Sequence, residues 1–327
     1  MQKKNIALLM GGDSAEAAIS VQSAEQVLKN LDEGLFNVYP ITIKGTSWTY
    51  SENGTIYEID RTDFSLTANN NRINFDCAVL MIHGTPGEDG RLQAYLELVN
   101  VPYTSCGVLT SSLTFNKHAC KTYLNALGIL FPKGKLIRKN EKVNTSELFA
   151  WLGLPCFIKP NSGGSSFGVT KIKKSSELTP ALEAAFAQDT NEVLIEEYIE
   201  GKEITCGLVK INEKIIALPI TEIVSKKEFF DVEAKYTEGM SEEITPARIS
   251  DSLRSDCEIL STAIYKYLNC NGIIRIDYIV RDGRLYFLEV NTIPGMSAVS
   301  IIPKQIEAAG IMSLKTIFTN LINEAIT

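Results

Sequence analysis

Apolar runs and amphipathic stretches alternate along the first third of the chain. The run at 5–10 leads into Gly11-Gly12-Asp13-Ser14, and apolar residues at helical spacing follow as far as Leu28. A strand, a tight turn and a helix in this order predict a doubly wound parallel sheet with helices on its faces, an α/β fold. Further strands are expected at 36–43, 75–82 and 101–104 and a helix at 92–99, whereas 44–74 is polar with short apolar patches and is expected to be irregular.

The middle of the chain has a different order of elements, more typical of α+β folds. A helix is expected at 111–127, with Lys117 and Lys121 one turn apart on the same face. A strand ending in Lys159 leads into a loop rich in glycine and serine at 161–169. Strands are also expected at 169–172 and 192–199 and from Gly201 onward. The predicted units are an α/β domain at 1–112, a central lobe at 113–200 and a C-terminal lobe at 201–327.

A β-hairpin near the end of the chain carries the most informative pattern. Apolar and β-branched runs at 273–280 and 285–290 flank an Asp282-Gly283 pair, which favours a hairpin turn. A two-residue turn would place Asp277 and Glu289 on opposite faces, because side chains alternate along a strand. A three-residue loop ending in a left-handed Gly283 would instead gather four polar side chains on one face: Arg275, Asp277, Glu289 and Asn291.

Carboxylates in an otherwise apolar hairpin are costly unless something positive pairs with them. We therefore predict the three-residue loop and an all-oxygen divalent metal site on this face of the hairpin. Mg²⁺ is the preferred ion. The alternative is a structural salt-bridge cluster between Arg275 and the two acids.

Composition excludes several classes of protein. The chain has 327 residues, 45% apolar and 22% charged, with a formal net charge of −7 and no basic block, which argues against nucleic-acid binding. The N-terminus has too few apolar residues before Gly11 for a signal peptide or a membrane span, so we expect a cytoplasmic protein. Seven scattered Cys without CxxC spacing predict reduced, buried thiols, and two His exclude a histidine-rich metal centre.

Two polar side chains are expected at the carboxyl edge of the first sheet, where ligands of doubly wound folds bind. Glu16 follows the first strand by a few residues. It could bind a cation or an ammonium group, or simply complement the helix dipole. His83 opens the loop 83–90, which holds three glycines and two acids. We expect His83 to orient Glu16 or a substrate group, with a hydrogen-bonded structural role as the alternative.

Candidate phosphate contacts come from the middle of the chain. The loop at 161–169 lacks the Gly-Lys-Ser/Thr of a Walker sequence, but it offers backbone N–H groups and hydroxyls, with Lys159 at its base. A plain flexible hairpin is the alternative. The strand 192–199 ends in acids that could hold an adenine and a ribose between two lobes.

The order of these features resembles the ATP-grasp superfamily, and within it the D-alanine–D-alanine ligase family. The resemblance covers nearly the whole chain and rests on five motifs in sequence: Gly11-Gly-Asp-Ser-Ala-Glu16, His83-Gly-Thr-Pro-Gly-Glu-Asp-Gly90, Glu233-Ala-Lys235-Tyr236, Arg275-Ile-Asp277 and Leu288-Glu-Val-Asn-Thr-Ile-Pro-Gly-Met296. It implies an N-terminal α/β domain followed by two lobes that close on ATP and two Mg²⁺ ions, with Mn²⁺ as a substitute. It also implies transfer of a phosphoryl group to one D-alanine and attack by a second.

The resemblance further implies a role for each matching residue. Glu16 would hold the ammonium of the first D-alanine, oriented by Ser165 and Tyr236, with His83 nearby. Arg275 and the Gly295 amide would form the oxyanion hole. Ser300 and Ile301 fall where the family binds the second substrate. Residues 229–240 would be the lid. The implied nucleotide ligands are Lys117, Lys159, Lys235, Glu196, Glu197, Tyr198 and Glu203, and the metal ligands are Asp277, Glu289 and Asn291.

Other positions bear on supporting contacts and on the product. Ala17-Ala18 and Ile293 depart from the commoner family pattern. Tyr236 and Ile301 favour D-alanine over D-lactate as acceptor. The competing predictions are an acceptor such as D-serine or D-lactate, another ATP-grasp carboxylate–amine ligase, and a catalytically silent nucleotide-binding protein. The resemblance also implies a homodimer.

Overall fold

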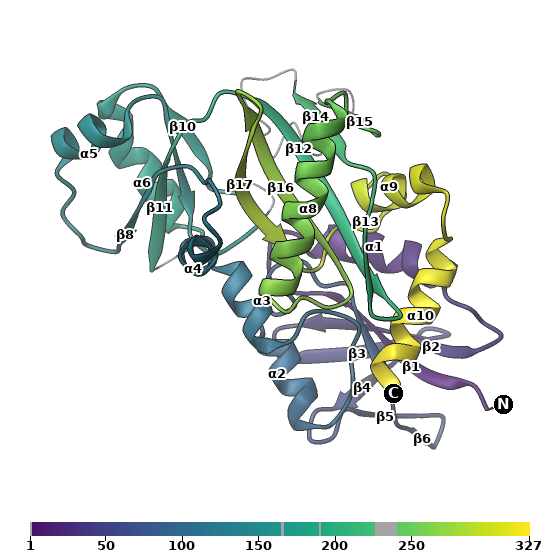
Figure 1. The fold of residues 1–327 in the computed structure, drawn as a ribbon. Helices are drawn as coiled ribbons and strands as arrows, with labels where there is room; N and C mark the ends of the chain where they lie inside the picture. The colour runs from purple at the N-terminus through teal and green to yellow at the C-terminus, as the bar shows by residue number, and fades with distance from the viewer. Residues whose placement is uncertain (1, 165–166, 190, 226–240) are drawn as a thin grey trace.

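The computed structural model describes residues 2–164, 167–189, 191–225 and 241–327. Three β-sheets with helices against them make up this part of the chain (Figure 1). In Figure 1 the N-terminal sheet lies below, the C-terminal sheet above it and the central sheet to the left. The ends of the two upper sheets approach each other, and this junction positions the site.

The N-terminal sheet has a parallel core with an antiparallel extension. Its strand order is β6-β5-β4-β3-β2-β1-β7, and β1 pairs in parallel with both β2 and β7. The helices of this part are α1 (Ala17–Asn30), α2 (Arg91–Leu98) and α3 (Val108–Phe115). The strands are β1 (Lys4–Gly11), β2 (Phe36–Lys44), β3 (Ser47–Glu52), β4 (Thr55–Asp60), β5 (Ser65–Ala68), β6 (Asn71–Ile73) and β7 (Cys77–Leu80).

The prediction that 44–74 is irregular is wrong, because this segment forms the four antiparallel strands β3 to β6. The turns between them hold Asn53-Gly54 and Asn69-Asn70, all with positive φ. Asn and Gly adopt this backbone region readily, so short strands can fold back tightly. The expected strand at 101–104 is reduced to a single parallel bridge between Ala78 and Tyr103.

The central lobe is a four-stranded antiparallel sheet in the order β10-β9-β11-β8. Its strands are β8 (Gly134–Arg138), β9 (Cys156–Pro160), β10 (Thr170–Ile172) and β11 (Glu192–Glu197), with helices α5 (Thr145–Leu152) and α6 (Leu178–Phe186) and a 3₁₀ turn, η2 (Ser175–Glu177). The single helix predicted at 111–127 is broken at Asn116 into α3 and α4 (Lys117–Leu124), followed by the 3₁₀ turn η1 (Asn125–Leu127). Asn116 has an extended backbone, and its side chain caps α4 by accepting a hydrogen bond from the Ala119 N–H, as asparagine often does.

The C-terminal lobe is built on a sheet ordered β15-β14-β12-β16-β17, with β13 also paired to β12. Its strands are β12 (Lys202–Ile211), β13 (Lys214–Ala217), β14 (Thr221–Ser225), β15 (Ser241–Ile244), β16 (Ile273–Arg281) and β17 (Arg284–Asn291). The helices α8 (Asp251–Tyr267), α9 (Ile301–Ala309) and α10 (Leu314–Ile326) belong to the same lobe.

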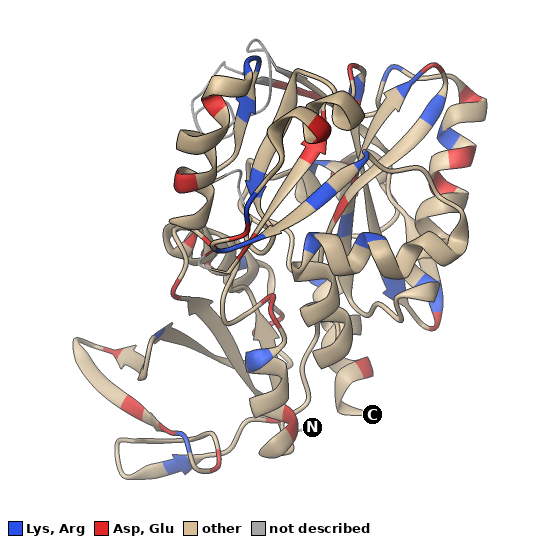
Figure 2. Ribbon diagram, turned by 90° about the vertical axis from the view of Figure 1, so that its left-hand side faces the viewer, with Lys and Arg blue, Asp and Glu red and all other residues tan. Residues whose placement is uncertain are grey.

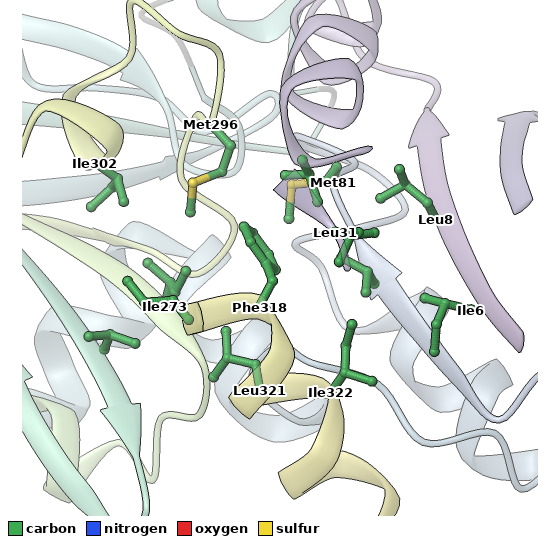
Figure 3. Close-up of a cluster of buried hydrophobic side chains, with 14 of the residues drawn as sticks. Ile6, Leu8, Leu31, Met81, Ile273, Met296, Ile302, Phe318, Leu321 and Ile322 are labelled. Atoms are coloured by element: carbon green, nitrogen blue, oxygen red, sulfur yellow. The ribbon is translucent and has the colours of Figure 1, made fainter. Parts of the chain in front are cut away.

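One buried cluster joins the N-terminal sheet to the C-terminal lobe. It contains Leu8 from β1, Ile273 from β16 and Phe318 from α10, and Figure 3 shows these side chains converging. The helix α10 contacts α1, β7 and β12, so it lies between the two units. A shared core therefore holds α1, which begins next to Glu16, and the hairpin of β16 and β17, which carries Asp277 and Glu289.

The hairpin of β16 and β17 has a different turn from the predicted one, but it brings the same polar side chains together. The connection is the two-residue turn Asp282-Gly283, in which both residues have positive φ, and the predicted three-residue loop is wrong. An Asp-Gly pair suits this tight turn. A β-bulge at Leu288 then shifts the register, so that Asp277 lies opposite Glu289 and Arg275 opposite Asn291. The four polar residues are cross-strand neighbours, as expected.

Candidate active site

A cavity of about 530 Å³ lies between the central and C-terminal lobes. Apolar side chains from both lobes form part of its wall, including Phe157, Ile199 and Ile279. Eight residues predicted for the nucleotide and metal line it: Lys117, Lys159, Glu196, Glu197, Tyr198, Glu203, Asp277 and Glu289. Its size and its mixture of apolar walls with convergent charges are typical of a ligand site.

Lysines at one end of the cavity are paired with carboxylates. The Lys159 ammonium lies 2.5 Å from Glu196 Oε2, and the other oxygen of Glu196 is bound by Lys121. The Lys117 ammonium donates to the Gly163 carbonyl at 2.6 Å and lies 3.2 Å from Glu289 Oε2. Burial alone would raise the pKa of Glu196, but the two lysines hold it below its ordinary value.

Lys121 was noted in the sequence but was given no role there. It is 6% exposed, and burial lowers its pKa to about 8 in spite of the attraction of Glu196. Its position one turn after Lys117 was the available signal. Nothing in the sequence indicated that the two lysines would contact different acids.

Asp277 accepts hydrogen bonds at both carboxylate oxygens. Arg275 donates to them through Nε at 2.9 Å and Nη2 at 2.8 Å, and the Asn291 amide donates to Oδ2 at 3.1 Å. The Thr205 hydroxyl, on the neighbouring strand β12, donates to Oδ1 at 2.5 Å. Thr205 was missed by the sequence reasoning, since only the strand pairing of β12 with β16 reveals that it faces Asp277.

This donor set fits Mg²⁺. Two carboxylates and an amide lie on one face of the hairpin, and oxygen ligands are what Mg²⁺ prefers. Over the described ranges, there is no cluster of three or more His, Cys, Asp and Glu that could hold a metal. The Asn291 amide and the oxygens of a bound substrate would therefore have to complete the shell, as in many phosphate-bound Mg²⁺ sites.

Glu16 lies on the other side of the glycine loop from this cavity. It is 8% exposed, and its N–H donates to the Ser14 hydroxyl at 3.1 Å at the start of α1. A Cβ added at Gly164 would lie 2.7 Å from Glu16 Oε2. Because Gly164 also lines the cavity between the lobes, Glu16 is close to that cavity.

His83 connects the first domain to the loop that follows β17. Its Nδ1 lies 2.8 Å from the Ile293 carbonyl, which can only accept, so Nδ1 carries the proton. Burial lowers the pKa of His83, which favours the neutral ring. The Ser23 hydroxyl then donates to Nε2 at 3.0 Å and itself accepts from the Met296 N–H. His83 therefore holds the segment that contains Gly295.

Glu88 supports the same loop and was not singled out from the sequence. Its carboxylate accepts from the Gly84 N–H at 2.8 Å and from the Ile293 N–H at 3.3 Å. Burial, followed by the nearby charge of Glu16, raises the pKa of Glu88 to about 8.

The residues expected at the second substrate lie just beyond this loop. Ser300 precedes α9 and its hydroxyl lies 2.8 Å from that of Ser297, while Ile301 is buried at the first position of the helix. A Cβ at Gly295 would lie 2.9 Å from Ser300 Oγ, so the Gly295 backbone and Ser300 are adjacent. Ser165, Lys235, Tyr236 and the lid 229–240 lie outside the described residues.

Charges of both signs are interspersed over the described ribbon (Figure 2). None of the helices that the structure describes is long and apolar enough to cross a membrane. An α/β domain is followed by two lobes, with a cavity between them that is lined by lysines and by Asp277 and Glu289 of the β16–β17 hairpin. This arrangement defines an ATP-grasp protein.

Comparison with known proteins identifies the family. The model of the D-ala D-ala ligase N-terminus matches residues 5–106, and that of the D-ala D-ala ligase C-terminus matches residues 124–323. A D-alanine--D-alanine ligase of Azobacteroides pseudotrichonymphae genomovar. CFP2 is 48% identical over 98% of this chain and 99% of the relative. The chain belongs to the D-alanine–D-alanine ligase family, which confirms the predicted membership.

Solved structures agree with this assignment. The VanG D-Ala:D-Ser ligase from Enterococcus faecalis superposes with a TM-score of 0.87 and 33% identity, covering 98% of this chain and 99% of that one. The D-alanine--D-alanine ligase from Bacillus anthracis complexed with ATP has a TM-score of 0.79 and 33% identity, over 100% of this chain and 97% of that one. The predicted α/β domain followed by a two-lobed ATP-grasp fold is confirmed.

Proposed function

We propose that this protein uses ATP to join two D-alanine molecules into D-alanyl-D-alanine, for the synthesis of peptidoglycan precursors. One observation carries the proposal. Gly164 lines the cavity that suits a nucleotide, and a Cβ there would lie 2.7 Å from Glu16 Oε2. An acid suited to an ammonium group is therefore next to the place where the phosphates would end.

In the first step, a carboxylate oxygen of the first D-alanine attacks the γ-phosphorus of ATP. The bond from that phosphorus to the β-phosphate bridging oxygen breaks, which gives D-alanyl phosphate and ADP. Lys117 and Lys159 would neutralise phosphate oxygens, together with Lys235. Four further residues line the cavity and would hold the adenine and the ribose: Glu196, Glu197, Tyr198 and Glu203. Glu16 would hold the D-alanine ammonium with Ser165 and Tyr236, and His83 would support that site.

In the second step, the amine of the second D-alanine attacks the acyl carbon and loses a proton, and inorganic phosphate leaves. Negative charge develops on the former carbonyl oxygen. Arg275 and the Gly295 N–H would stabilise it, because donors fixed before the reaction lower the barrier of acyl transfer. Ser300 and Ile301, at the start of α9, would bind the second D-alanine.

Asp277, Glu289 and Asn291 would hold two Mg²⁺ ions, or Mn²⁺ in their place. When bound, the ions would supply positive charge next to the phosphates, which favours phosphoryl transfer. Arg275 pairs with Asp277, and Lys117 pairs with Glu289. Each of these acids therefore lies beside a cation that is itself proposed to contact the substrates.

D-alanine is the acceptor best supported by the apolar, buried Ile301. D-serine is the second candidate, because the structural relative from Enterococcus faecalis is described as a D-Ala:D-Ser ligase. D-lactate and a different carboxylate–amine pair are further alternatives. We also propose that the protein acts in the cytoplasm as a homodimer.

Replacing Glu16 tests the assignment of the first subsite. The Glu16→Gln variant should lose turnover by about a hundredfold or more while it still binds ADP, since it loses charge at the D-alanine ammonium and not at the phosphates. Glu25→Gln, at an exposed position on α1, is the matched control and should behave as wild type. Equal turnover in Glu16→Gln and the control would contradict the proposed subsite. Mass spectrometry of products formed with D-alanine and D-serine in competition identifies the acceptor.

A further inference from the structure

Lys121 lies behind the nucleotide cavity and is absent from its lining, whereas Lys117, one turn earlier on α4, lines it. The Lys121 side chain is enclosed, at 7% exposure, and its ammonium pairs with Glu196 Oε1. The other oxygen of Glu196 lies 2.5 Å from the Lys159 ammonium. One buried carboxylate is thus shared between a lysine that faces the cavity and a lysine that is shielded from it.

This sharing matters because Lys159 cannot fully neutralise two anions at once. Glu196 is 3% exposed, and a buried carboxylate left without a counterion is strongly unfavourable. If Lys159 turned toward a phosphate, Glu196 would still keep one enclosed ammonium. Without Lys121, the carboxylate would retain Lys159 and compete with the incoming phosphate.

We infer that Lys121 is a positioning residue, the enclosed counterion of Glu196 that releases Lys159 to bind the phosphates of ATP. The inference rests on the proposed function, in which Lys159 is a phosphate ligand. The charged groups around Lys121 are Glu196 from β11, Lys159 from β9 and, farther away, Glu289 from β17, and Lys117 precedes it on its own helix. Of these, only Glu196 makes an ion pair with Lys121 in the described structure.

A purely structural role for Lys121 makes a different prediction. If the residue only kept α4 packed against the sheet, its loss would disturb the whole cavity and weaken every ligand alike. A counterion role affects only ligands that need Lys159, which means ligands with phosphates. Comparing a nucleotide with its nucleoside separates the two roles.

The test measures equilibrium binding of ADP and of adenosine to the full chain and its variants. Lys121→Met removes the charge and keeps the length of the side chain, and it should weaken ADP about tenfold or more while changing adenosine less than about twofold. Lys121→Arg keeps the charge and should retain most of the ADP affinity. Lys135→Met is the control: it removes an exposed positive charge from β8, the strand paired with β11, and should bind ADP as the wild type does.

A double-mutant cycle with Glu196→Gln ties the effect to this carboxylate. Glu196→Gln removes the carboxylate that pairs with Lys159, so adding Lys121→Met to this variant should cost little further ADP affinity. If Lys121→Met alone does not fold, the ADP affinity of Glu196→Gln is compared with that of the variant carrying both Glu196→Gln and Lys121→Met, and this comparison still tests the inference.

Three results would overturn the inference. They are an equal loss for ADP and adenosine in Lys121→Met, an undiminished loss in the Glu196→Gln background, and unchanged ADP affinity in Lys121→Met. A wild-type protein that binds no ADP would instead refute the proposed function, and this inference with it.

Discussion

Replacing Phe318 with alanine tests whether the N-terminal domain and the C-terminal lobe form one cooperative unit around the site. Phe318 is 1% exposed in the cluster that joins them, and Figure 3 shows it at the centre, with Met296 and Ile273 to one side and Met81 and Leu31 to the other. Losing the ring removes about 2 kcal/mol of transfer free energy. A cavity term of similar size brings the expected loss of stability to about 3–5 kcal/mol.

The assay is urea unfolding followed by two probes, tryptophan fluorescence and circular dichroism. Trp48 reports on the first domain and Trp151 on the central lobe, and single-tryptophan variants separate their signals. We expect the Trp48 transition to move together with the loss of overall helix signal in Phe318→Ala. Ile259→Ala, at a position that is 66% exposed on α8, is the control and should change stability by less than about 0.5 kcal/mol. A loss below about 1 kcal/mol in Phe318→Ala, or a Trp48 transition that does not move, would refute the shared core.

Further predictions concern single polar contacts. Thr205→Val removes the hydroxyl that donates to Asp277 and should weaken Mn²⁺ binding in the presence of ADP by about 10-fold or more. Thr205→Ser should bind Mn²⁺ nearly as the wild type does. The measurement is a Mn²⁺ titration monitored by electron paramagnetic resonance, and an unchanged affinity in Thr205→Val would contradict the prediction. Hydrogen bonds from Arg248, with help from Lys202, lower the pKa of Glu222 from 4.5 to about 2, so this carboxylate stabilises the fold above pH 4.5 and loses that effect as the pH falls toward 2. Glu222→Gln should therefore be about 2 kcal/mol less stable than wild type in urea at pH 7 and equal to it near pH 2, and a deficit that does not depend on pH would refute the assignment. His83→Ala leaves the Ile293 carbonyl and the Ser23 hydroxyl without the ring that they contact, and it should lower the free energy of unfolding by about 2–3 kcal/mol. It should also lower turnover more than ADP affinity. Unchanged stability would show that the ring does not hold the loop after β17.

The hairpin of β16 and β17, where the metal site is predicted, shows what the sequence could predict and what it could not. The alternation of side chains and the cost of buried carboxylates indicated that Asp277 and Glu289 share a face, which they do. The route was wrong, because the Asp282-Gly283 turn is tight and the extra residue is absorbed at Leu288. The type of a turn depends on adjacent residues and can be predicted from them, whereas a bulge depends on how the strand packs against its neighbours.

Contacts between distant segments could not be predicted for the same reason. The strand–turn–helix order of the first domain could be predicted from apolar spacing. The strands of 44–74 were missed because each has only three to six residues, which is too short for a clear alternating pattern. Thr205 beside Asp277 and Lys121 beside Glu196 depend on strand pairing and helix placement. Neither pair has a signal in the spacing of its own residues.

The most direct measurement of the proposed function is phosphate release from Mg-ATP by the wild-type protein, with D-alanine, L-alanine, D-serine and D-lactate supplied in turn, and with the product identified by mass spectrometry. We predict phosphate release that depends on D-alanine, with one D-alanyl-D-alanine formed for each phosphate. No release with D-alanine, or release equal to that with L-alanine and without dipeptide, would contradict the assignment.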